Sequence, residues 1–247
     1  MICNVTDESY HPVRTLFILL MCIAAIGDTK AFSKGGPETI VRAERIIDRI
    51  DYLPFTSKKD GCYARALYMG MELAIHGIPA LNHYVFGSLR PTKGIRWRYH
   101  VAPMVATNGQ LVVFDPSLNE RPLTRRRWLA LNRPRGQTQT FVTPASHYRR
   151  DRVEPLSSQG EKGYSLSSRY RRVKKFPKYR ISHIADACRT AWTHIGKENI
   201  PRREKSIKRS KLNARTRYLI QKLKRLRILD REDAMTSCSQ GRFEVRT

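Results

Sequence analysis

The dipeptide Asn108-Gly109 constrains the fold more than any other feature of this sequence. It separates two stretches typical of β-strands, 96–106 and 110–115. Asn-Gly between such stretches is the strongest short signal for a two-residue hairpin turn. Residues 80–89, rich in Tyr, Val and Phe, and 138–142 are expected to form further strands. The sequence therefore predicts an antiparallel sheet.

The expected turn also predicts which side chains share a face of the sheet. If Thr107 pairs with Gln110, the same register places Asp115 opposite Ala102 and Ser117 opposite His100, so Asp115 lies two residue pairs away from His100. Such diagonal neighbours lie ~7–8 Å apart by backbone, within reach of a carboxylate and an imidazole. His100 and Asp115 are expected to meet on one face, against which a neighbouring helix would lie.

Apolar residues recur at helical spacing in 37–50 and 61–76, which precede the strands, and a short helix is expected at 124–131. Gly77 and Pro79 end the second helix, and Asp60 is its expected N-cap. Helices followed by an antiparallel sheet define an α+β domain.

Composition separates the chain into a body and a basic end. Lys and Arg number 47 against 21 Asp and Glu, and 26 of the basic residues fall in 151–247 with only 10 acidic ones. This balance excludes an acidic disordered chain and argues against a neutral housekeeping enzyme. We expect 157–247 to be a basic, partly helical extension, with helices near 182–195 and 202–229. Residues 160–247 would then meet an acidic protein, a nucleic acid or a membrane surface.

The apolar run 15–27 is about a dozen residues long, whereas a membrane span needs roughly 20. It resembles a secretory signal peptide cleaved near Ala31, although a buried helix is the alternative. The expected division is 1–31 signal peptide, 32–156 catalytic domain and 157–247 extension.

Of the five cysteines, Cys62, Cys188 and Cys238 remain after cleavage, so one free thiol is expected. No CxxC or HExxH pattern occurs, and no metal site is predicted.

Cys62 is the candidate nucleophile. In the first turn of a helix, the dipole and the free backbone N–H groups favour a thiolate and can also hold an oxyanion. With His100 to move the proton and Asp115 to fix the imidazole tautomer, the three residues predict a Cys–His–Asp triad.

The motifs DGCYARA, WRYHVAPMV and VVFDPSLNERPLT resemble the bacterial protein-glutaminase family, over roughly residues 55–150. The resemblance implies a papain- or transglutaminase-like fold and deamidation of glutamine side chains in proteins or peptides, with release of ammonia. It implies Cys62 as nucleophile, His100 as acid and base, Asp115 as orienter, and no cofactor. Together with the signal peptide, it implies an exported protein, with a host-directed effector as one form.

Two other activities use the same triad, and the sequence leaves them open. A transglutaminase transfers the acyl group to an amine, and a cysteine protease cleaves a peptide bond.

The candidates for a substrate slot are Gly61, Tyr63, Trp97 and Tyr99. For the three aromatic residues, the alternative is a place in the hydrophobic core. A different class, a basic nucleic-acid-binding protein, is suggested by RYRRVKKFPKYR at 169–180.

Overall fold

The computed structural model describes residues 36–56, 60–92, 94–107, 110–148, 178–230 and 238. The helices are α2 (Pro37–Asp48), α3 (Cys62–Ile75), α4 (Arg125–Leu131), α6 (Ile181–Lys197) and α7 (Arg202–Arg225). The strands are β1 (Leu81–Leu89), β2 (Trp97–Thr107), β3 (Gln110–Val113), β4 (Leu123–Thr124) and β5 (Pro134–Pro144). None of the described helices has the length and apolarity that a membrane span requires. The predicted α+β class is confirmed.

The five strands form one antiparallel sheet in the order β4-β3-β2-β1-β5. The hairpin between β2 and β3 has the predicted register, from Thr107 opposite Gln110 to Met104 opposite Val113. The amide N–H of Phe114 adds a hydrogen bond to the carbonyl of Pro103, at 2.9 Å. Beyond this point β3 no longer pairs with β2. The stretch of β2 that carries His100 therefore pairs with β1 on one side and with no part of β3 on the other.

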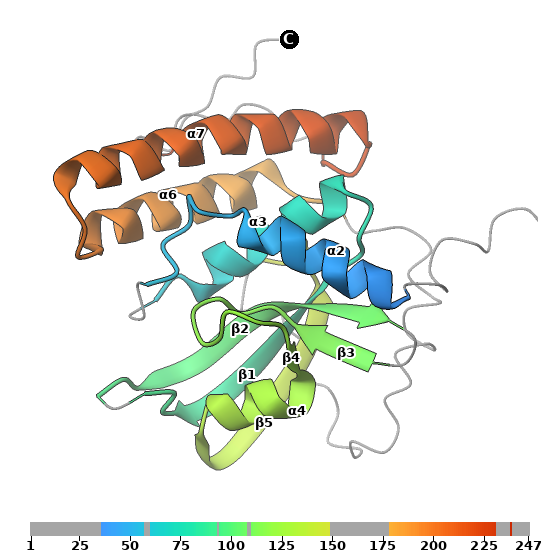
Figure 1. The fold of residues 1–247 in the computed structure, drawn as a ribbon, viewed down its shortest axis with the longest axis vertical. Helices are drawn as coiled ribbons and strands as arrows, with labels where there is room; N and C mark the ends of the chain where they lie inside the picture. Colours follow the sequence, from blue (N-terminus) through green and yellow to red (C-terminus); the bar gives the residue numbers. More distant parts are fainter. Residues whose placement is uncertain are drawn as a thin grey trace, which may run out of the picture. The chain divides into compact units, whose positions relative to one another are not determined.

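The two faces of the sheet carry different covers (Figure 1). On one face, Tyr84, Val101 and Phe141 pack with Cys62 and Ala66 of α3. On the other face, Trp128 of α4 packs with a second apolar cluster, which includes Leu81, Val85, Met104 and Val113. Side chains alternate between the faces along each strand, which explains why neighbouring residues of β2 belong to different clusters.

The helix α3 is buried over almost its whole length, from Cys62 to Leu73, with the half-buried Tyr63 as the exception. A helix that is apolar around its circumference needs cover on every side, and the sheet supplies only one. α6 and α7 supply much of the rest, because their apolar side chains join those of α3 in the largest cluster of the core. Its members include Leu67, Met71, Ile184, Ala191, Leu212 and Leu219.

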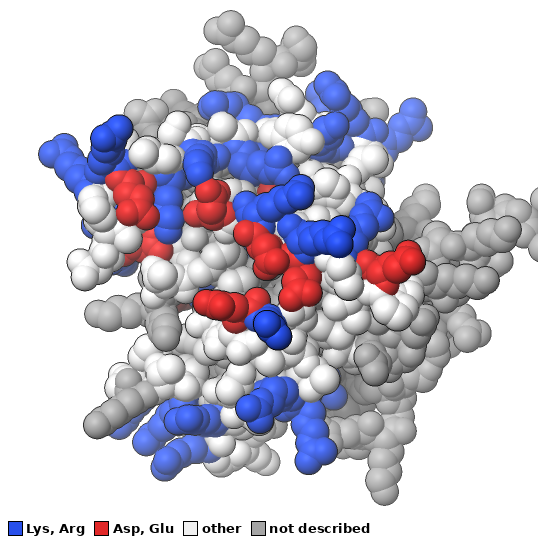
Figure 2. All heavy atoms as spheres, in the orientation of Figure 1, with Lys and Arg blue, Asp and Glu red and all other residues white. Residues whose placement is uncertain are grey.

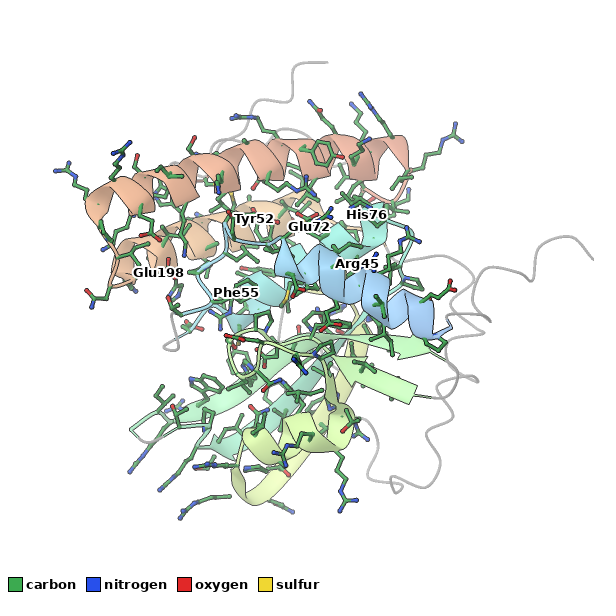
Figure 3. The ribbon with its side chains drawn as sticks, viewed as in Figure 1. Arg45, Tyr52, Phe55, Glu72, His76 and Glu198 are labelled. Atoms are coloured by element: carbon green, nitrogen blue, oxygen red, sulfur yellow. A yellow bond between two sulfur atoms is a disulfide. The ribbon has the colours of Figure 1, made fainter. Side chains whose placement is uncertain are left out.

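The C-terminal helices α6 and α7 are therefore part of the same compact unit as α3 and the sheet. The predicted boundary at residue 157 differs from this arrangement, since helices after it share a core with helices before it. The apolar stripe of α7, which includes Leu212, Leu219 and Leu223, packs into this core. Tyr52 and Glu72 lie at the layer between α3 and α7 (Figure 3). The predicted signal peptide, and most of 157–180, lie outside the described residues.

Cys188 of α6 and Cys238 form a disulfide, with their Cα atoms 5.1 Å apart. Among the described cysteines Cys62 is free and buried. This agrees with the expectation of one free thiol among the three cysteines that follow the predicted signal peptide.

Candidate active site

Cys62 is the first residue of α3, with 7% of its surface exposed. The predicted N-cap was wrong by one residue. Gly61 occupies the cap with φ +84°, a left-handed conformation that glycine adopts without steric cost, and Asp60 accepts a hydrogen bond from the Gly61 N–H at 2.7 Å. No side chain caps α3. The N–H groups of its first turn therefore remain available to an anion bound at Cys62.

His194, on α6, lies directly behind this turn. A Cβ atom at Gly61 would sit 3.0 Å from the imidazole Cδ2 of His194. Glycine is thus required at residue 61 for two reasons, the positive φ and the nearby ring. The sequence held no sign of the second reason, because His194 is distant along the chain.

His100 and Asp115 are in direct contact, as predicted. The His100 Nε2 and the Asp115 Oδ2 are 2.7 Å apart, and both side chains are buried. Two further donors hold the same carboxylate: the Ser117 hydroxyl donates to Oδ1 at 2.5 Å, and the Trp128 indole N–H donates to Oδ2 at 2.7 Å. A carboxylate with three donors is fixed in its charged form and in its orientation.

Two tryptophans enclose the imidazole. The ring of Trp97 stacks on His100 with centroids 4.4 Å apart, and the ring of Trp128 stacks at 5.6 Å. Trp128 therefore both orients the carboxylate and packs against the ring that the carboxylate holds. This double role escaped sequence reasoning, since a tryptophan on a short helix carries no signal for it.

The electrostatics favour a charged pair. Burial by itself lowers the pKa of His100, but the charge and hydrogen bond of Asp115, with a smaller part from Cys62, raise it to about 9. Burial likewise raises the pKa of Asp115, and the opposing effects of His100, Ser117 and Trp128 lower it to about 2. At neutral pH the pair is an imidazolium beside a carboxylate.

Cys62 lies close enough to this imidazole to raise the pKa of His100. Asp115 occupies Nε2, whereas Nδ1 is buried and has no hydrogen-bond partner within the described part of the chain. Nδ1 is therefore the nitrogen available for proton exchange with Cys62. The three predicted catalytic side chains lie together.

One detail of the expected geometry was wrong. The face that His100 shares with Asp115 is covered by Trp128, whereas the body of α3 packs on the opposite face. His100 lies beyond Met104–Val113, the last residue pair between β2 and β3 on that side. The nucleophile comes from the first turn of α3, as predicted.

The aromatic candidates for a substrate slot lie near the triad. Trp97 packs on His100, Tyr99 stacks on Phe86 at 5.6 Å in the cluster that contains Cys62, and Tyr63 borders a cavity. Their part in substrate binding stays a prediction. Within the described ranges no group of three or more His, Cys, Asp or Glu side chains is placed to hold a metal ion.

A buried thiol at a helix N-terminus, beside a histidine held by an aspartate, is the arrangement of the cysteine hydrolases of papain and transglutaminase type. Residues 39–131, which contain all three side chains, match the family model described as "Glutaminase". The resemblance to protein-glutaminases predicted from the sequence is thus confirmed over this segment.

Similar solved structures are also protein-glutaminases. The NMR structure of protein-glutaminase from Chryseobacterium proteolyticum is 22% identical, with a TM-score of 0.44, over 51% of this chain and 82% of that one. A crystal structure of protein-glutaminase is 24% identical, with a TM-score of 0.41, over 47% of this chain and 78% of that one. A crystal structure of pro-protein-glutaminase is 22% identical, with a TM-score of 0.42, over 62% and 64%. No curated protein matches.

Proposed function

We propose that this chain hydrolyses the side-chain amide of glutamine residues in proteins or peptides, giving glutamate and ammonia. The observation that carries the proposal is the buried His100–Asp115 pair beside the free thiol of Cys62, within a segment that matches the glutaminase model.

The first half of the reaction forms a thioester. The sulfur of Cys62 attacks the amide carbon, and the carbonyl oxygen becomes an oxyanion held by first-turn N–H groups of α3. The imidazolium of His100 donates its Nδ1 proton to the amide nitrogen. The C–N bond then breaks and ammonia leaves. Throughout, the Nε2–H of His100 donates to Asp115, which keeps Nδ1 directed at the reacting atoms.

The second half consumes water. Neutral His100 now accepts a proton at Nδ1 from a water molecule, and the hydroxide attacks the thioester carbon. The carbon–sulfur bond breaks, and the thiolate of Cys62 and the imidazolium of His100 are restored. The net change is one amide and one water to one carboxylate and one ammonium ion, which requires no cofactor.

The test is a blocked glutamine peptide incubated with the enzyme, with and without a primary amine, and analysed by mass spectrometry and an ammonia assay. The proposal predicts glutamate and equimolar ammonia in both cases. An amide joined to the added amine would instead indicate a transglutaminase, and shortened peptides would indicate a protease. Cys62→Ala is expected to abolish all products.

We also propose export into an oxidising compartment. The Cys188–Cys238 disulfide supports it, because such bonds persist mainly outside the cytosol. Mass spectrometry of the secreted material would establish where the mature chain begins and whether the disulfide is present. A reduced chain confined to the cytosol, with its N-terminus intact, would contradict export.

An anionic partner is the third part of the proposal. Lys and Arg side chains gather over α7 (Figure 2), and Arg217, Lys224 and Arg225 are among its exposed residues. Such a surface attracts acidic proteins, phosphate backbones and anionic membranes through long-range fields. Binding would concentrate the enzyme near its substrates without taking part in bond cleavage.

A further inference from the structure

A cavity of about 410 Å³ lies beside the first turn of α3. Tyr63 and Tyr148 line it on one side, with their rings edge to face and their centroids 5.2 Å apart. The other side is formed by polar residues of α6, namely Asp186, Arg189, Thr190, Thr193 and His194. A cavity of this size lies in the range used for ligand binding.

The α6 residues follow the spacing i, i+3, i+4, i+7 and i+8, which places them on one face of the helix. The apolar face of α6, which includes Ile184 and Ala191, packs into the core instead. α6 is therefore two-sided: one face secures the helix to α3 and α7, and the other lines the cavity.

The cavity adjoins the nucleophile through two contacts. Tyr63 follows Cys62 in the first turn of α3 and packs against the cluster that contains it. His194 lies against Gly61, the residue before Cys62. A substrate chain whose glutamine reaches Cys62 would pass next to this cavity.

The chemistry of the lining selects the kind of side chain that fits. Asp186 and Arg189 already form an ion pair with each other, and the Thr193 hydroxyl donates to the Arg189 carbonyl at 2.9 Å. A charged side chain would meet two exposed charges that already offset each other, so it would gain little from either. A small side chain would leave most of the volume unfilled. An aromatic ring can stack against Tyr63 and Tyr148, as aromatic pairs prefer.

We propose that this cavity binds an aromatic side chain of the protein substrate, on a residue flanking the glutamine. The inference rests on the proposed function and deepens it. Of the residues that line the cavity, those of α6 and Tyr148 lie outside the segment that matches the glutaminase model. The selectivity would therefore be this chain's own, added to the chemistry of the matched segment.

The experiment measures kcat/KM for blocked glutamine peptides in which one flanking residue is Phe, Leu, Lys, Glu or Gly, on either side of the glutamine. Phe on one side is expected to raise kcat/KM on the order of tenfold over Gly, mainly through KM, which corresponds to one aromatic contact. Leu, Lys and Glu are expected to stay closer to Gly.

Two variants assign the preference to the cavity. Thr190→Phe fills it and should reduce the Phe-to-Gly ratio to near one. Ser182→Phe makes a similar change at an exposed position of α6 outside the cavity and should leave the ratio and the activity unchanged. If Thr190→Phe fails to fold by circular dichroism, Thr193→Trp makes the same test.

The two proposals fail differently. Deamidation of every peptide with no preference for Phe, or a preference that survives filling of the cavity, would overturn this inference and leave the proposed function standing. A preference for Lys or Glu would overturn the aromatic assignment. Deamidation of no peptide would overturn both.

Discussion

Arg215 on α7 holds Glu72 on α3 through two contacts, Nε to Oε1 at 2.6 Å and Nη2 to Oε2 at 2.5 Å. The Tyr52 hydroxyl donates to the same Oε1 at 2.6 Å, and Glu72 is only 2% exposed. A carboxylate buried in the helix that carries Cys62 is thus neutralised by a residue of the basic C-terminal region. The helix that carries Cys62 is thus joined to that region by a buried carboxylate as well as by apolar packing.

Arg215→Ala is expected to reduce the free energy of unfolding by about 2–3 kcal/mol, because it leaves Glu72 buried without its cation. Arg215 is partly exposed, so the loss stays below that expected for a fully buried ion pair. Arg217→Ala, at an exposed position two residues away, should change it by less than about 0.5 kcal/mol. Urea unfolding measures both. Equal stability of the two variants would contradict the role of the pair.

A chain that ends at residue 156 is expected to be unfolded, since it lacks the apolar faces of α6 and α7 that cover α3. Circular dichroism and proteolysis would show this directly. A truncated chain that stays folded and deamidates a peptide would instead restore the boundary predicted from the sequence.

Gly61→Ala and Gly77→Ala form a matched pair. Both glycines have positive φ, +84° and +70°, so each substitution should cost about 1–2 kcal/mol of stability. Only at Gly61 does the new Cβ meet a ring, that of His194, while nothing lies within 4 Å at Gly77. Gly61→Ala should therefore displace Cys62 and lower kcat on the order of a hundredfold. Gly77→Ala should keep a kcat close to that of the wild type.

The double variant Gly61→Ala with His194→Ala separates the two causes of that loss. Removing the ring should recover part of kcat relative to Gly61→Ala, while the cost of the positive φ remains. Unchanged kcat in the double variant would mean that contact with His194 does not position the nucleophile.

Asp115→Asn tests the orienting carboxylate through the pH profile. In the wild type the imidazolium persists until the pH approaches about 9, so kcat/KM should fall above that pH. Without the Asp115 charge, burial remains and lowers the pKa of His100, so this limb should move to lower pH. Turnover should fall on the order of a hundredfold or more.

Ser117→Ala is the control for that substitution. It removes one hydrogen bond to Asp115 and keeps the charge, so kcat should fall by less than about tenfold, with only a small shift of the alkaline limb. An alkaline limb that stays near pH 9 in Asp115→Asn would show that His100 does not govern it.

Charge reversal tests the anionic partner without removing core residues. Arg217, Lys224 and Arg225 changed together to Glu should weaken binding to DNA and to vesicles of anionic lipid at least about tenfold, and flatten its salt dependence. Reversal of Arg121, Arg126 and Arg127, exposed residues near or on α4, makes the same change in net charge elsewhere. Equal losses in both triple variants would show that net charge, and no surface on α7, governs binding.

Local patterns in the sequence were sufficient for most of the helices and strands, although not for the short strand β4, and for the centre of the site. The turn predicted for Asn108-Gly109 implies the pairing of Thr107 with Gln110 that β2 and β3 have, and apolar periodicity located α3 with Cys62 in its first turn. These features depend on residues close together in the chain, where spacing alone carries the geometry.

The contacts that escaped prediction join residues far apart in sequence. The apolar positions of α7, among them Leu212, Leu219 and Leu223, can be read from the sequence, but their partner on α3 cannot; all three are fully buried. The roles of His194 and Trp128 likewise depend on how helices dock, which no local pattern encodes. Asp60 was favoured as N-cap by residue type, but the left-handed turn that presents Cys62 requires the next residue, Gly61.

Deamidation through Cys62 is the central claim, and incubation of a blocked glutamine peptide in heavy-oxygen water tests it most directly. If a thioester on Cys62 is hydrolysed by water, each glutamate formed carries one heavy oxygen, ammonia appears in equal amount, and every backbone amide stays intact. Cys62→Ala should give none of these products. Glutamate that forms equally well with Cys62→Ala, or a peptide cut at its backbone, would contradict the account.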